Sequence, residues 1–288
     1  MCPEISRRVV VTGAGGQLGR AVRAQAPDAV ALRREDLDIT DDAAVRAVLE
    51  PGDVVLNCAA YTAVDAAESD VAGAFARNET GPAVLAAACT AVRATLIHVS
   101  TDYVFDGTGT SPYEPSDATG PTTVYGRSKL AGEQAVLRCA PDAHVVRTAW
   151  VYTGDQRDFV ATMRRLERER DTVSVVNDQI GSPTFAPDLA AGLLELARSI
   201  DSGADGIAPI LHATNAGQAS WFDLARAVFA GVGADPERVR PCSSAEYPSS
   251  TPRPAYSVLS NRAWTASGLT PLRDWRSALD DALTRLDQ

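Results

Sequence analysis

The chain has 288 residues, enough for one large α/β domain with a smaller lobe and a sizeable hydrophobic core. Its 45% hydrophobic and 22% charged residues are ordinary for a globular protein, and no apolar run is long enough to span a bilayer. The net charge of −10 disfavours nucleic-acid binding, and five scattered cysteines without a C-x-x-C pair indicate no metal site. We therefore expect a cytoplasmic protein that binds no membrane, no nucleic acid and no metal.

The first half of the chain alternates short β-branched runs with alanine-rich segments of helical period, which is typical of a parallel sheet wound with helices. This pattern predicts strands over 8–12, 29–32, 53–57, 95–100 and 144–148. It predicts helices between them, over 18–26, 42–49, 71–89 and 125–138. The third strand contains the continuous apolar run Val54-Val55-Leu56, as burial on both faces of a helix-covered sheet requires. We therefore predict a Rossmann-like, doubly wound α/β fold.

A glycine-rich turn follows the first predicted strand. The run Gly13-Ala14-Gly15-Gly16-Gln17-Leu18-Gly19 places glycines in a G-x-x-G-x-x-G register between that strand and the next helix. A tight turn, a backbone close to a pyrophosphate and close packing of helix on strand each exclude a Cβ atom. The helix N-terminus then offers free N–H groups to the phosphates. The run therefore predicts a dinucleotide site built from Gly13, Gly15, Gly16, Gln17, Leu18 and Gly19.

Two arginines, Arg33 and Arg34, stand where the second strand ends. A basic residue at this point suits the 2′-phosphate of NADPH, whereas an acidic one binds the 2′-hydroxyl of NAD. We therefore expect NADPH to be preferred, with NADH possible because Glu35 and Asp36 follow at once. Further cofactor contacts are expected beside the adenine and after the third strand, from Asp38, Ile39, Ala59, Ala60, Tyr61 and Thr62.

The strongest chemical signal is Tyr125-Gly126-Arg127-Ser128-Lys129 at the start of a predicted helix. The i, i+4 spacing puts the Tyr125 hydroxyl and the Lys129 ammonium on one face of that helix. The ammonium is expected to lower the pKa of the phenol, so that Tyr125 serves as a general acid or base. Thr101 ends the fourth strand, at the sheet edge where α/β folds bind ligands, and can bond the substrate oxygen beside Tyr125.

The regular alternation of predicted strands and helices ends after Trp150. Helices are predicted over 159–170, after Pro187 and over 275–286, and we assign most of this part to a substrate-binding lobe. The expected division is a NAD(P)-binding Rossmann-like domain over 1–150 and a mainly substrate-binding lobe over 151–288. Strands near 173–176 and 211–214 are expected to return to the main sheet.

Together, the glycine turn, the strand-end hydroxyl and the Tyr/Lys pair resemble an extended short-chain dehydrogenase/reductase over the whole chain. Within that superfamily the sequence resembles the dTDP-4-dehydrorhamnose reductase family. The likeness rests on several motifs, which cover residues 16–19, 57–65, 100–105, 125–133, 147–152 and 177–184, with Arg253-Pro254 and Ser257.

The resemblance implies reduction of the C4 carbonyl of a dTDP-linked 6-deoxy-4-ketohexose. Tyr125 would donate the proton, Lys129 would tune Tyr125 and bind the cofactor ribose, and Thr101 would hold the carbonyl oxygen. Asp102 and Trp150 would contact the sugar nucleotide, although core packing is an equal alternative for Trp150. Arg253 could pair with the diphosphate, or could be a solvated charge in a Pro-rich loop.

The chain departs from some relatives at two positions. Certain members of the family carry Glu in the first helix and after the Pro-Thr motif, and these residues are associated with a magnesium-bridged dimer. The matching positions here are Ala21 and Pro187. We therefore expect a monomer or a weak homodimer formed in another way.

Two other functions are compatible with the fold. A nucleotide-sugar epimerase or dehydratase uses the same Tyr/Lys pair, but dehydratases typically follow the Thr with Asp and Glu, and here Tyr103 follows Asp102. A non-catalytic NADP-binding regulatory subunit would need no tuned phenol, so the intact Thr101, Tyr125 and Lys129 argue against it. The sequence therefore favours a reductase.

Overall fold

The computed structural model describes residues 5–155, 158–247 and 250–286. Its centre is a six-stranded parallel sheet in the order β2-β1-β3-β4-β5-β10. The strands are β1 (Val9–Thr12), β2 (Val30–Leu32), β3 (Val54–Asn57), β4 (Thr95–Thr101), β5 (His144–Thr148) and β10 (Ile210–His212). Because β1 lies between β2 and β3, the winding reverses beside it, and the carboxyl ends of the strands open there into a crevice. The predicted doubly wound α/β fold is confirmed.

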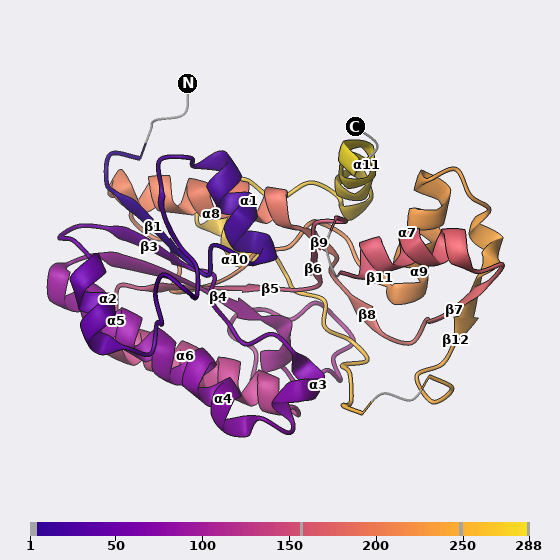
Figure 1. Ribbon diagram of the computed structural model, residues 1–288, viewed down its shortest axis with the longest axis horizontal. Coiled ribbons are helices and arrows are strands. Elements are labelled where there is room, and N and C mark those ends of the chain that lie inside the picture. The colour runs from indigo at the N-terminus through magenta and orange to yellow at the C-terminus, as the bar shows by residue number, and fades with distance from the viewer. Residues whose placement is uncertain (1–4, 156–157, 248–249, 287–288) are drawn as a thin grey trace.

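Helices cover both faces of this sheet (Figure 1). One face carries α1 (Gln17–Gln25), α8 (Ala186–Asp201) and α10 (Arg262–Ala266). The other carries α2 (Asp42–Val48), α5 (Gly81–Val92) and α6 (Val124–Cys139). Side chains alternate along each strand, so Val9 and Val11 join the core under α1 and α8, whereas Val10 joins the core under α5.

The helix expected over 71–89 is interrupted. It consists of α4 (Val71–Phe75), a π-helical turn η1 (Ala76–Thr80) and α5. Pro82 has no N–H to donate to the carbonyl of Asn78, which explains why regular α-helical bonding fails at this point. The turn faces α6 so closely that a Cβ added at Gly132 would lie 1.9 Å from the Asn78 carbonyl oxygen.

The second half of the chain builds a smaller lobe with its own core. Its helices are α7 (Phe159–Glu169), α9 (Trp221–Gly231) and α11 (Trp275–Leu286). Its strands pair in twos: β6 (Val151–Tyr152) with β9 (Thr184–Phe185), β8 (Ile180–Gly181) with β11 (Ala219–Ser220), and β7 (Val173–Val176) with β12 (Val239–Cys242). Short elements complete the described chain: α3 (Val64–Ala67), η2 (Asp102–Val104) and η3 (Pro236–Arg238).

One strand prediction for this half is confirmed and one is wrong. β10 returns to the main sheet beside β5, as expected for the strand near 211–214. The strand at 173–176 does not return, because β7 pairs with β12 in the lobe. Ser174 in its middle is exposed, whereas β1 and β3 are buried at every position, so β7 suits an open two-stranded ribbon.

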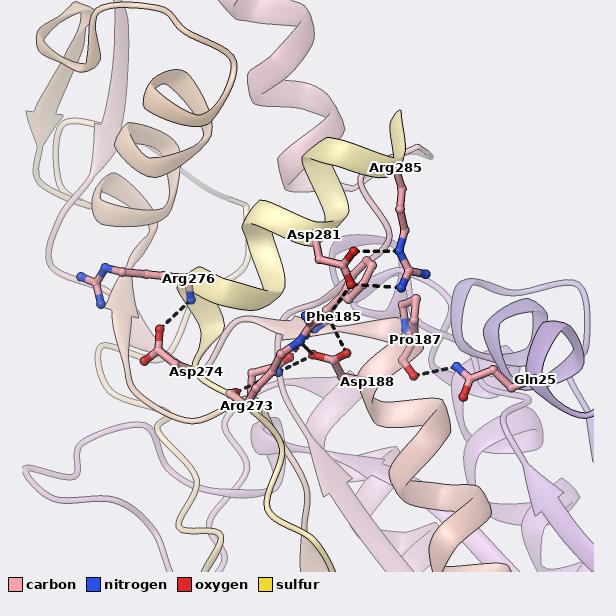
Figure 2. Close-up of polar contacts among 10 residues, drawn as sticks. Gln25, Phe185, Pro187, Asp188, Arg273, Asp274, Arg276, Asp281 and Arg285 are labelled. Carbon is pink, nitrogen blue, oxygen red and sulfur yellow. Dashed lines mark hydrogen bonds and ion pairs between the residues drawn. The ribbon is translucent and has the colours of Figure 1, made fainter. Parts of the chain in front are cut away.

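A polar cluster joins the lobe to the main domain (Figure 2). Arg273 Nε donates to Asp188 in the first turn of α8 at 2.7 Å, and its Nη2 donates to Asp281 of α11 at 2.7 Å. Arg285 binds the same Asp281. Gln25 donates to the Pro187 carbonyl at 2.8 Å, so α1, α8 and α11 are fixed to one another. None of the helices in the described part of the chain has the length and apolar character that a membrane-spanning helix needs.

Candidate active site

A cavity of about 1550 Å³ lies between the main sheet and the small lobe. The segments that follow β1, β3, β4 and β5 form one wall, and α7 and β7 form the opposite wall. The parallel strands place their carboxyl ends together at this edge, so residues far apart in sequence meet here. The predicted site residues are therefore expected to line this cavity.

The glycine turn forms one end of the cavity as a cradle without side chains. Gly13 has a φ of +68°, and a Cβ there would lie 2.5 Å from the backbone nitrogen of Ala59. A Cβ at Gly19 would lie 2.3 Å from the Gly13 carbonyl oxygen, so α1 packs directly on the turn. Gly16 caps α1 without a side-chain bond, which leaves first-turn N–H groups for a phosphate. These features fit a dinucleotide.

The two arginines after β2 lie differently. Arg34 lines the cavity with Asp38 and Ile39. Arg33 is about half exposed and lies 3.6 Å from the Glu35 carboxylate. The Asp38 carboxylate accepts two hydrogen bonds from Thr40, which lower its pKa. Arg34 is therefore the arginine that can reach a 2′-phosphate from the cavity wall.

A buried polar network that the sequence did not suggest supports the segment after β3. Asn57 Oδ1 accepts bonds from Thr12 Oγ1 at 2.7 Å and from the Ala59 N–H at 3.1 Å, and its amide nitrogen lies 2.9 Å from His98 Nδ1. The Asn78 side chain accepts a hydrogen bond from the Tyr61 backbone N–H and donates one to the Tyr61 carbonyl. The only sequence signal for these residues was a polar side chain inside an apolar element.

Thr101, Tyr125 and Lys129 meet at the middle of the cavity. Thr101 ends β4, and its hydroxyl donates to Asp102 Oδ1 at 3.0 Å. Tyr125 lies in the first turn of α6, where Thr123 caps the helix, and its hydroxyl interacts with that of Thr101. Lys129 follows one turn later, is 2% exposed and donates from Nζ to the Val99 carbonyl at 2.7 Å. The predicted trio is therefore brought together.

The pKa of Tyr125 differs from the sequence expectation. Burial raises it to about 12, and the Thr101 hydrogen bond opposes this only in part. The Lys129 ammonium donates to the Val99 carbonyl, and the expected lowering of the phenol pKa does not outweigh the effect of burial. Burial also lowers the pKa of Lys129 to about 8. Tyr125 thus keeps its proton at neutral pH, as a proton donor must.

Asp102 is a buried carboxylate at the wall of the cavity. Burial raises its pKa to about 6, which exceeds the opposing effect of its hydrogen bonds. Its side chain is 2% exposed and faces the same cavity as Tyr125. A carboxylate placed here, with spare acceptor capacity, is suited to receive a hydroxyl of a sugar.

Trp150 lines the cavity and is held in a strained conformation. Its φ is +47°, which is unusual for a residue other than glycine. Its ring stacks on Trp221 with centroids 3.5 Å apart, and a Cβ at Gly181 would lie 2.4 Å from the other side of the ring. The 177–184 motif therefore makes room for Trp150, and Trp150 both packs in the lobe and presents an apolar surface to the cavity.

Arg253 also lines the cavity and is not a free surface charge. Its Nη2 donates to Asp65 of α3 at 2.7 Å, and Ser250 donates to the same carboxylate at 3.0 Å. Partial burial alone would raise the pKa of Asp65, but these partners and Thr251 lower it. The C-terminal loop is thereby connected to the main domain across the mouth of the cavity.

Most predicted site residues line this one cavity. They are Gly13, Gly16, Gln17, Leu18, Gly19, Arg34, Asp38, Ile39, Ala59, Ala60, Thr62, Thr101, Asp102, Tyr125, Lys129, Trp150 and Arg253. Gly15, Arg33 and Tyr61 lie outside its wall. A Cβ added at Gly15 would lie 3.8 Å from Cγ of Arg33, and the Tyr61 ring lies beside Arg77.

Comparison with known proteins gives one consistent result. A family model described as the RmlD substrate binding domain matches residues 7–288. The dTDP-4-dehydrorhamnose reductase of Mycobacterium tuberculosis H37Rv is 58% identical over 287 residues, which cover 96% of this chain and 93% of that protein.

Solved structures agree with this. A dTDP-4-dehydrorhamnose reductase from Clostridium acetobutylicum has a TM-score of 0.90 and 38% identity over 98% of this chain and all of that one. A second one, from Bacillus anthracis in complex with NADP, has a TM-score of 0.89 and 34% identity over 97% of this chain and 99% of that one.

Proposed function

We start from the fact that this chain belongs to the dTDP-4-dehydrorhamnose reductase family, and we propose that it reduces the C4 carbonyl of a dTDP-linked 6-deoxy-4-ketohexose. The relatives support the general statement that the chain is a reductase of dTDP-sugars. The C4 position, the source of the hydride and the proton donor are our proposals. We also propose that residues 1–150 mainly bind the cofactor and residues 151–288 mainly the substrate.

NADPH, with NADH as a weaker alternative, would supply the hydride. The Gly13–Gly19 cradle and the uncapped start of α1 would hold its pyrophosphate. Arg34, on the cavity wall, would bind the 2′-phosphate through a charge-assisted hydrogen bond. Lys129 would bind the nicotinamide ribose.

Tyr125 would donate the proton that the C4 oxygen needs once hydride has reached C4. It carries this proton at neutral pH, because burial raises its pKa to about 12. Thr101 would hold the same oxygen by turning its hydroxyl proton from Asp102 Oδ1 toward the substrate, since this hydroxyl also lies next to that of Tyr125. As negative charge develops on the oxygen, the two hydroxyl donors and the nearby Lys129 ammonium would stabilise it.

The substrate would lie between the catalytic residues and the lobe. Asp102 would accept a sugar hydroxyl, and Trp150 would cover the apolar face of the sugar ring. Arg253 would bind the diphosphate bidentately from the position in which Asp65 holds it. The diphosphate and the base would then supply most of the binding energy.

The observation that carries this proposal is the meeting of Thr101, Tyr125 and Lys129 beside the glycine cradle in one cavity. The same geometry argues against a dehydratase. Tyr103 stands where a dehydratase has its Glu, and its ring packs edge-on against Tyr125 with centroids 5.4 Å apart. A neutral, buried phenol here, whose pKa burial raises well above its ordinary value, cannot serve as the base that elimination of water requires.

A substrate panel tests the proposal. Oxidation of NADPH is followed with the dTDP-4-keto-6-deoxy sugar, its UDP and GDP counterparts and dTDP-glucose, for the wild type and for Tyr125→Phe. We expect turnover with the dTDP-4-keto sugar, and a loss of about 10² to 10⁴ in kcat for the variant, because only the proton donor is removed. NADPH binding, measured by fluorescence, should stay nearly unchanged.

Other outcomes point to the alternatives. Consumption of dTDP-glucose without net oxidation of NADPH would indicate a dehydratase. Tight NADPH binding with no turnover of any sugar nucleotide would indicate a regulatory subunit. Near-normal turnover by Tyr125→Phe would remove Tyr125 from the mechanism.

A further inference from the structure

A buried ion pair lies directly behind the catalytic residues, and the proposed function does not use it. Glu133 is 1% exposed and Arg147 is 2% exposed. Arg147 donates from Nε to Glu133 Oε1 at 2.9 Å and from Nη2 to Glu133 Oε2 at 2.8 Å. The free energy lost by burying two charges is often about as large as the free energy gained from their attraction. Stabilisation of the fold therefore does not by itself explain this ion pair.

The pair continues the catalytic face of α6. Tyr125, Lys129 and Glu133 are spaced i, i+4 and i+8, so they form one stripe along the helix. Arg147 comes from β5 and is fixed as well, since it stacks over the Phe105 ring at 5.0 Å and donates to the Pro115 carbonyl. Glu133 is therefore held in place with both of its oxygens occupied, one helical turn beyond the ammonium.

Lys129 needs an anion because its surroundings disfavour a charge. Its Nζ has the Val99 carbonyl as a partner, but a neutral carbonyl does not balance an ammonium. Cys58 and His98 also face it. Burial raises the pKa of Cys58 to about 12 and lowers that of His98 well below its ordinary value, so both are uncharged at neutral pH. Tyr125 is also uncharged.

Of the groups that act on Lys129, Glu133 is then the carboxylate that forms a buried ion pair. Desolvation lowers the pKa of Lys129 to about 8, and the Glu133 carboxylate is the largest effect in the opposite direction. The charge of Arg147 is paired with Glu133 through hydrogen bonds to both carboxylate oxygens.

We propose that Glu133 is a positioning residue of this active site, whose carboxylate, fixed by Arg147, keeps the Lys129 ammonium protonated in its buried place. This inference rests on the proposed role of Lys129 beside Tyr125. Without the carboxylate, Lys129 loses its proton at lower pH. It then offers neither a positive charge to the developing oxyanion nor a full set of donors to the ribose.

The chain offers a direct measurement, because Lys129 is its only lysine. Protein labelled with ¹³C at the lysine ε-carbon gives one lysine signal, and the pH dependence of its chemical shift reports the protonation of Lys129. The full-length chain is used, with a lysine-free purification tag. No substrate and no assignment are needed, so the result does not depend on which carbonyl the enzyme reduces.

Three variants separate charge from packing. In Glu133→Gln we expect the midpoint of the Lys129 titration to fall by about one pH unit, because the negative charge next to the buried ammonium is removed. In Arg147→Met the carboxylate remains, so the midpoint should not fall, although this variant also breaks the buried pair. If Glu133→Gln does not fold, the double variant Glu133→Leu with Arg147→Met replaces the pair by apolar side chains. It should show the same fall.

The pH profile of kcat/KM gives the second readout. The alkaline loss of activity should move to lower pH in Glu133→Gln by the same amount as the lysine midpoint, and Glu133→Asp should restore part of it. An unchanged lysine midpoint in the variants that lack the carboxylate would overturn the proposal. An equal fall in Arg147→Met would do so as well, because it would assign the effect to loosened packing.

Discussion

Two arginines that are adjacent in the sequence have side chains in different surroundings. Arg33 and Arg34 are indistinguishable in the sequence, and both are candidates for the 2′-phosphate of NADPH. Of the two, Arg34 lines the cavity, whereas Arg33 lies near Gly15 and pairs with Glu35. A phosphate at this end of the cavity can therefore contact Arg34, and Arg77 lines the same cavity.

The first prediction concerns this pair. Arg34→Ala should weaken NADPH binding by about tenfold and leave NADH binding nearly unchanged, because a charge-assisted hydrogen bond to the 2′-phosphate is lost. Arg33→Ala is the matched control and should change neither affinity by more than about twofold, as exposed ion pairs contribute little. Titration of both cofactors into both variants checks this. Equal weakening for the two cofactors would show that Arg34 does not read the 2′-phosphate.

At the scale of elements, helix α6, which carries Tyr125 and Lys129, packs against the π-helical turn η1. Gly132 faces the Asn78 carbonyl on the side of α6 that packs against η1. Asn78 in turn donates to Ser128, one residue before Lys129, and holds the Tyr61 backbone. The turn thus connects the cofactor-binding segment to the helix that carries Tyr125 and Lys129.

The second prediction tests this contact. Gly132→Ala should destabilise the protein by about 1–3 kcal/mol, because the added Cβ meets backbone that cannot move without shifting α6. It should also lower kcat, since the shift displaces Tyr125. Thermal unfolding and steady-state kinetics measure the two effects.

Gly231→Ala is the matched control at the end of α9. Its added Cβ would meet only the Cδ1 atom of Leu283, which can rotate away. We expect the control to keep both its stability and its kcat. A Gly132→Ala variant as stable and active as the control would mean that α6 is not held by η1.

At the scale of the whole molecule, the cavity exists because two lobes are held at a fixed distance. The Arg273 cluster is one of the links (Figure 2). Hydrogen bonds from Arg273, and then from Arg285, lower the pKa of Asp281. A carboxylate with a lowered pKa in the folded state stabilises the fold above the pKa of the unfolded chain, and this stabilisation is lost as the pH falls.

The third prediction follows from this loss of stability at acid pH. Arg273→Met should lower the free energy of unfolding by about 1 kcal/mol at pH 7, because Asp188 and Asp281 lose their shared partner in a partly exposed cluster. The difference from the wild type should shrink as the pH falls below about 4, from the ordinary pKa of an aspartate in the unfolded chain down through the lowered pKa of Asp281. Denaturant unfolding at several pH values measures it.

Arg276→Met, in the first turn of α11, is the control. The Arg276 guanidinium lies over the Trp275 ring, 4.4 Å from its centroid, and only its backbone N–H binds Asp274. We expect a smaller loss of stability in this variant, with no dependence on acid pH. A constant difference between Arg273→Met and the wild type from pH 7 to 3 would exclude an electrostatic link at this point.

The sequence by itself determined the features that repeat locally or need a particular residue type. The apolar runs and helical periods predicted the parallel, helix-covered sheet and placed most of its elements to within a residue or two, because burial on both faces restricts composition strongly. Glycines in the first turn and the Tyr125/Lys129 spacing predicted residues that the structure brings to one cavity, because steric exclusion of Cβ and helical geometry leave a trace in the order of residues.

Only the tertiary structure decided the properties that arise between distant segments. The pairing of β7 with β12, the choice of Arg34 over Arg33 and the partner of Arg253 depend on which surfaces meet, and no local pattern records this. The protonation of Tyr125 is the clearest case. Spacing alone suggested a lowered pKa, but the pKa is set by desolvation, and desolvation depends on everything that packs around the phenol.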